Sequence, residues 1–212
     1  MEDITNSLKT LSHIATQIDM LLHLSRVTYT NRAALDQNIL LEGYYRGEKY
    51  STTMLSVNLN NVIIFANAYL DELNGQLTPA KYPADAEKIL AYRRVVKPAL
   101  KRIRKWTHLK DLRNELLVHN YRVKDVSIFS VAYQKKEYNA PAKDQEILLL
   151  GDLILLINKQ LFAFFPEEIG SMLAVKERII DKYKATDNPI NYREEIAAIT
   201  QQVEELKKRE LE

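Results

Sequence analysis

Apolar residues recur at steps of three and four along most of the chain, the spacing that gathers them on one side of an α-helix. The first such run predicts a helix over residues 5–27, and the second predicts a helix over residues 51–73. The sequence EGYYRGEK between them contains two glycines and indicates a break. After the second run, Gly75 can cap the helix and Pro79 prevents its continuation, so a turn is expected there.

A third helix is predicted to begin near Pro83 and to run toward His119. Pro98 should bend or divide it, because proline removes a backbone donor inside a helix. In residues 121–141, β-branched and aromatic residues alternate without a helical period, which predicts an irregular loop or a small hairpin. Further helices are predicted over residues 147–165, 166–184 and 192–211. The last has a narrow apolar seam suited to docking on the bundle or to pairing with a second copy.

These patterns predict an all-α, up-and-down helical bundle that forms one domain over residues 1–212. Five glycines and six prolines are too few for the turns of an all-β protein of this length. The apolar run at 147–165 invites a membrane interpretation, but Asp152, Asn158 and Lys159 would then lie at bilayer depth. We therefore expect a central helix buried on many sides, and no membrane partner.

Composition also limits the chemistry. The chain has no cysteine, which excludes disulfides, thiolate metal ligands and a cysteine nucleophile. It contains no glycine-rich phosphate loop, no HExxH and no Gly-x-Ser-x-Gly sequence. His13 and His23 lie on the first predicted helix without further ligands at short spacing, so we expect no metal and no cofactor. The acidic, polar start MEDITNSLKT does not resemble a signal peptide, and we expect a cytoplasmic protein.

A run of cations precedes the tryptophan of the third predicted helix. Seven basic residues lie between positions 93 and 105 without an acid among them. The formal net charge of the chain is only +2, so attraction for nucleic acid must come from local clusters such as this one. A solvated helix face is the alternative interpretation. Five of the cations form a basic stripe at helical spacing: Arg94, Lys97, Lys101, Arg104 and Lys105.

The stretch DLRNELLVHNYR, residues 111–122, places polar groups near the apolar side of a predicted helix. With about 100° of rotation per residue, Arg113 falls within the arc of leucines and His119 falls beside it. A buried guanidinium needs a carboxylate, a carbonyl or a cleft that admits a phosphate. Asp71 or Glu72 could supply a structural salt bridge, and the histidine could be a hydrogen-bonded core residue. His108 lies nearby, where WTHLKD reads as a helix start or linker.

The motif formed by Arg113, Asn114 and His119, at the end of a helix in an all-α chain, resembles the HEPN superfamily of nucleic-acid-processing helical domains. The sequence LRNELLVHNYR is similar to the LRNxxLAHN-type segment of HEPN proteins associated with phage defence, with Val118 where alanine is common. Tyr121 supplies the His-any-Tyr extension found in some branches.

The resemblance covers about residues 51–165 and implies a HEPN-like four-helix core. The N-terminal helix at 5–27 and the C-terminal helices at 166–211 would be additions to that core. It further implies a homodimer in which the two motifs face each other, often with metal-independent ribonuclease activity. RNA is then the expected substrate, and a cognate antitoxin or inhibitor protein is a possible partner of such an effector.

The chemistry implied by the resemblance follows from the residue types. His119 titrates near neutrality, so it can take a proton from an RNA 2′-hydroxyl or give one to the leaving 5′-oxygen. Arg113 would stabilise the charge that develops on the phosphoryl oxygens. Asn114 would orient the arginine or the substrate, and Tyr121 would donate to phosphate or stack on a base. A dimer brings two histidines for two proton transfers, which makes dimerisation part of the mechanism.

Three interpretations remain open from the sequence. The first is a dimeric HEPN-type endoribonuclease, a toxin or defence effector. On a straight helix Arg113 and His119 are about 120° apart, so this interpretation needs a helix end or a partner subunit between them. The second is a catalytically inactive HEPN-like module that binds a protein or nucleotide, with the arginine paired to Asp71 or Glu72. The third is a DNA-binding bundle that uses the basic stripe.

Overall fold

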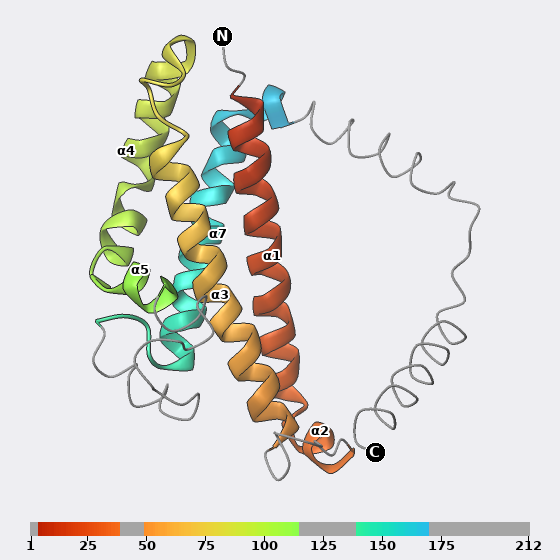
Figure 1. Cartoon of the computed structure of the whole chain (residues 1–212). Helices are drawn as coiled ribbons and strands as arrows, with labels where there is room; N and C mark the ends of the chain where they lie inside the picture. Colours follow the sequence, from red (N-terminus) through yellow and green to blue (C-terminus); the bar gives the residue numbers. More distant parts are fainter. Residues whose placement is uncertain (1–3, 39–48, 115–138, 170–212) are drawn as a thin grey trace, which may run out of the picture. The chain divides into compact units, whose positions relative to one another are not determined.

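The computed structural model describes residues 4–38, 49–114 and 139–169, and within them it is mostly helical, without a strand (Figure 1). The prediction of an all-α helical bundle is confirmed. Its long helices alternate in direction and are α1 (Thr5–Thr30), α3 (Tyr50–Gly75), α4 (Ala86–Ile103) and α7 (Asp144–Phe164). Shorter elements connect them: α2 (Arg32–Asn38), η2 (Pro83–Asp85) and α5 (Leu109–Asp111).

α1 is part of the bundle core and not an addition to it. It packs along α3 and also against α7. The predicted ranges 5–27 and 51–73 match α1 and α3 to within three residues at each end. The structure therefore differs from the expectation that a core over residues 51–165 carries the first helix as an appendage. The apolar α1 residues with 2% exposure or less are Leu8, Leu11, Ala15, Ile18 and Leu22.

α4 continues through Pro98 without division. The proline lies on the exposed side of the helix, and so does Arg94, whose carbonyl would have accepted the missing N–H bond. Water can satisfy that carbonyl, so the helix tolerates the proline. The prediction that the helix runs toward His119 is wrong, because α4 ends at Ile103 and a new helical turn, α5, begins at Leu109.

α7 is buried on one side only, which corrects the expectation of a helix buried on many sides. Its inner face contacts α1, α3 and α4. On its outer face, Leu149, Leu156 and Phe162 are 39%, 50% and 43% exposed. Among the described helices, α7 has the length and composition of a membrane span, a property that helices in the cores of soluble proteins share. Asp152 on this helix forms an ion pair of 2.8 Å with Arg26 of α1.

α1 and α7 approach closely at Gly151. A β-carbon at this position would lie 2.8 Å from Cδ2 of the fully buried Leu22. Any side chain at this position would therefore require the end of the Leu22 side chain to shift within the core.

Two predictions fall largely beyond the described part of the chain. Residues 166–169 are helical, and the remainder of the predicted helix 166–184 and the whole of 192–211 lie outside the described residues, as does most of the segment 121–141. Contacts divide the chain into Met1–Met172 and Leu173–Glu212, and every helix named above belongs to the first unit. One domain over residues 1–212 stays a prediction.

Candidate nucleic-acid site

α5 is held against the C-terminal half of α3 by a buried amide. Asn67 of α3, only 4% exposed, donates from Nδ2 to the carbonyl oxygen of Leu109 at 3.2 Å. The same nitrogen donates to the Ile63 carbonyl at 2.9 Å, one turn earlier on α3. Leu109 and Leu112 are buried beneath this contact. The turn that begins α5 is therefore held in place by uncharged contacts, independently of its charged residues.

Arg113 lies one helical turn beyond that anchor, in the wider π-helical turn formed by residues 112–114. Its Nη1 donates to Oδ2 of Asp71 at 2.6 Å, and its Nε donates to Oδ1 of Asn114 at 2.9 Å. The Arg113 side chain is 17% exposed, while the Asp71 side chain is 48% exposed. Asn114 thus holds one side of the guanidinium through this bond.

Asp71 lies between two cations. Besides Arg113, the ammonium of Lys110 approaches its Oδ1 at 3.7 Å, and the Lys110 side chain is 66% exposed. Sequence reasoning did not select Lys110. The signal was its position three residues before Arg113, which puts the two side chains on neighbouring positions of one helix face.

The sequence left open whether Asp71 or Glu72 pairs with Arg113. Glu72 accepts a hydrogen bond of 2.7 Å from the hydroxyl of Ser7 on α1, so its carboxylate points toward a different helix. Asp71 is therefore the partner of the arginine in the described part of the chain. Both acids near the C-terminal end of α3 have partners that offset their unfavourable interaction with the helix dipole.

Two of the seven cations in residues 93–105 face inward. Arg93 donates from Nη2 to the carbonyl oxygens of Leu73 and Leu77, at 2.6 Å and 2.8 Å, and so binds the C-terminal end of α3. Burial lowers the pKa of the Arg93 guanidinium from its ordinary value. Arg102 lies 4.1 Å above the ring of the buried Trp106. These two arginines stabilise the fold.

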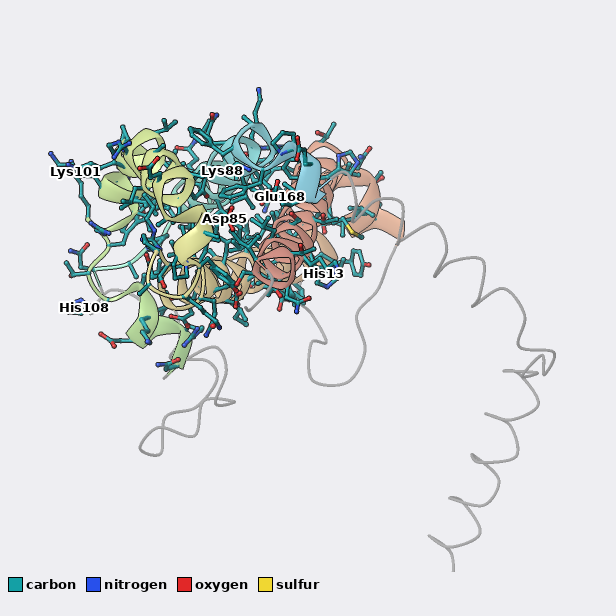
Figure 2. All side chains as sticks on the ribbon, turned by 90° about the horizontal axis from the view of Figure 1, so that it is seen from above. His13, Asp85, Lys88, Lys101, His108 and Glu168 are labelled. Atoms are coloured by element: carbon teal, nitrogen blue, oxygen red, sulfur yellow. The ribbon has the colours of Figure 1, made fainter. Side chains whose placement is uncertain are left out.

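The other five cations form the predicted basic stripe, and all five are exposed. Within the described residues, none of them forms an ion pair with a carboxylate. Figure 2 shows Lys101 of this stripe and His108 on the same side of the bundle. The stripe is therefore accessible to an external polyanion. Its members are Arg94, Lys97, Lys101, Arg104 and Lys105.

His108 is the residue before α5, as WTHLKD indicated, and it joins two distant parts of the chain. Its backbone N–H donates to the Asn139 carbonyl at 3.1 Å, and its Nδ1 accepts the Asn139 N–H at 2.9 Å. The Asn139 side chain donates to the Lys105 carbonyl at 3.0 Å and to the Thr107 hydroxyl at 3.2 Å. Residue 139 therefore returns to the loop that precedes α5, a contact that the sequence did not reveal.

His119 and Tyr121 lie outside the described residues, so the structure does not place them relative to Arg113. His13 and His23 are exposed on α1. Within the described ranges, no group of three or more histidines and acids is arranged to hold a metal ion. Comparison of the chain with protein-family models, with curated proteins and with solved structures finds no match.

Proposed function

We propose that this protein is a metal-independent endoribonuclease of the HEPN type, acting as a homodimer. The observation that carries the proposal is the placement of Arg113. Asn114 fixes its Nε, and the rest of the guanidinium reaches a partly exposed position on the same polypeptide segment as His119. An oriented guanidinium, in a chain that also carries an exposed basic stripe, is suited to binding a phosphodiester.

In this proposal the substrate's 2′-hydroxyl attacks the adjacent phosphate after losing its proton to one His119. The leaving 5′-oxygen receives a proton from the other histidine of the dimer. Arg113 stabilises the negative charge that develops on the phosphoryl oxygens. The basic stripe attracts the RNA backbone and aligns it along α4. Tyr121 contacts the phosphate or stacks on a base.

The proposed setting is the cytoplasm, where such an enzyme acts as a toxin or as a phage-defence effector. Uncontrolled RNA cleavage harms the cell that makes the enzyme. A cognate antitoxin or inhibitor protein is therefore part of the proposal.

The product ends test this function. The purified chain is incubated with labelled RNA in the presence of EDTA, and the fragments are analysed for 2′,3′-cyclic phosphate. We expect cleavage with cyclic phosphate ends, and its loss in His119→Ala. The matched control His13→Ala alters an exposed histidine of α1 and should cleave like the parent. Absence of cleavage, or equal cleavage by His119→Ala, contradicts the proposal.

A second candidate is a non-catalytic helical module that binds a protein partner or a nucleotide. The ion pair between Arg113 and Asp71 favours it, because a single chain then satisfies the arginine without a substrate. In that case the parent protein cuts no RNA under any condition. Arg113→Ala then lowers the melting temperature and changes nothing else.

A further inference from the structure

We propose that Lys110 and Arg113 form an oxyanion-binding site whose place is held by the Asp71 carboxylate in the free protein, and that a backbone phosphate of RNA displaces this carboxylate. The inference rests on the proposed function in taking RNA as the ligand. It adds a phosphate-binding lysine and a competing internal anion to that function.

The contacts around Asp71 have the form of an occupied anion site. One carboxylate oxygen accepts from Arg113 Nη1 at 2.6 Å, and the other lies 3.7 Å from Lys110 Nζ. Two non-bridging phosphate oxygens can make the same pair of contacts, since phosphate and carboxylate offer similar acceptors to a guanidinium. A structural ion pair needs one cation. The second cation, Lys110, is a further donor that a phosphate oxygen can use.

The exposed fractions of the three side chains show from which side an external anion reaches the site. Arg113 is 17% exposed and lies deepest, while Asp71 and Lys110 are 48% and 66% exposed and lie at the surface. The anion therefore arrives from the side on which the carboxylate lies. Ion pairs with a half-exposed partner contribute little to stability because solvent screens them, so displacement of Asp71 costs little.

Arg113 does not depend on Asp71 alone for its position, and the backbone that carries Lys110 is held independently of Asp71. The buried bond from Asn67 to the Leu109 carbonyl holds the start of α5, and Asn114 holds Arg113 Nε. When the carboxylate leaves, Arg113 keeps its hydrogen bond to Asn114, and Lys110 stays on the same turn of the chain. The site is thus organised for the incoming phosphate, which reduces the cost of binding.

Binding of an RNA that cannot be cut separates this inference from the proposed function. The probe is a short fluorescein-labelled oligouridylate with methylated 2′-hydroxyls, and its affinity is measured by fluorescence anisotropy. We expect Asp71→Asn to bind about threefold to fivefold more tightly than the parent, the equivalent of one exposed ion pair. Lys110→Ala should bind more weakly than the parent.

The matched control is Asp152→Asn. Asp152 also pairs with an arginine, Arg26, and its side chain is 50% exposed, but it lies on α7. We expect the control to bind like the parent. Tighter binding by Asp71→Asn alone supports the inference, whereas unchanged or weaker binding by a folded Asp71→Asn overturns it. If the parent does not cut unmodified RNA, the proposed function is wrong. The difference in RNA binding between Asp71→Asn and the parent still stands in that case.

The salt dependence provides a second measurement that a structural role would not change. Because the proposal places Lys110 against a phosphate, Lys110→Ala should reduce the slope of log K against log salt by about 0.7, the value for one contact with a single strand. A slope in Lys110→Ala equal to that of the parent overturns the inference, even if the affinity has changed.

Discussion

The side-chain amide of Asn67 donates to the carbonyl oxygen of Leu109 at 3.2 Å, and this buried bond fixes the turn that presents Lys110 and Arg113. Asn67 and Asp71 are four residues apart on α3, and their partners Leu109 and Arg113 are also four apart. The two contacts have the same spacing on both segments, so together they fix how residues 109–113 lie along α3. The first is buried and structural, and the second is partly exposed.

Asn67→Ala should destabilise the protein by about 0.5 to 1.5 kcal/mol, because the buried Leu109 carbonyl loses the Asn67 amide and keeps the Leu112 N–H as its donor. Urea denaturation measures this change. Asn61→Ala is the matched control, since Asn61 donates to the carbonyl four residues earlier, at 2.9 Å, and makes no second bond in the described residues. Equal effects of the two substitutions would show that the bond to Leu109 contributes nothing.

Gly151→Ala should destabilise the bundle by about 1 to 3 kcal/mol through overpacking against Leu22, partly offset by the helix propensity of alanine. Gly75→Ala is the control, because a β-carbon at Gly75 has no atom within 4 Å. The double variant Gly151→Ala with Leu22→Ala should be more stable than the sum of its single effects predicts, because the new methyl enters the space that Leu22 vacates. Simple additivity in thermal unfolding would contradict this packing.

Lowering the pH should destabilise the start of α7, because it protonates the Glu146 carboxylate. Hydrogen bonds from the Ala142 and Lys143 backbone N–H groups lower the pKa of this carboxyl below its ordinary 4.5. A lowered pKa gives stability that is present above pH 4.5 and is lost as pH falls through the folded-state pKa. We expect Glu146→Gln to reduce stability at pH 7 by about 0.3 to 1 kcal/mol, the range for an exposed carboxylate at a helix start.

The pH dependence distinguishes that contribution from a general effect of charge. The difference between Glu146→Gln and the parent should shrink as pH falls below 4.5. Asp19→Asn removes an exposed carboxylate from the middle of α1 and serves as the control. A stability difference for Glu146→Gln that stays constant from pH 7 to acid would contradict the assigned cause.

The basic stripe should contribute to RNA affinity in proportion to its charges. Lys97→Ala and Lys101→Ala should each weaken binding to RNAs of different sequence by a similar factor. Each should also reduce the salt slope by about 0.7 to 0.9. Lys159→Ala removes an exposed lysine of α7 and should change neither quantity. Sequence-dependent losses, or an effect of Lys159→Ala as large as the others, would argue against contact with the RNA backbone.

The sequence predicted the long helices well because apolar spacing determines which residues can share a buried face. It did not predict the end of α4 at Ile103 and the start of α5 at Leu109. The residues between them include neither glycine nor proline to mark a break, and one of them, Trp106, is buried. It also missed α2, whose seven residues are too few for a clear period.

The candidate site was predictable in part. The exposure of the basic stripe followed from helical spacing. The choice between Asp71 and Glu72 did not, because adjacent helix positions differ by about 100° and either can face a neighbouring helix. The contact of His108 with Asn139 joins residues far apart in the chain, and no local sequence pattern predicts such a contact.

The rate of RNA cleavage by Arg113→Ala in EDTA tests the central claim most directly. The variant must first be shown to be folded by circular dichroism, and Arg26→Ala, which loses a more exposed ion pair with Asp152, is the control. We predict that Arg113→Ala cleaves about 100-fold to 1000-fold more slowly than the parent, the loss expected when a group that stabilises transition-state charge is removed. Cleavage by folded Arg113→Ala at the parental rate would contradict the account.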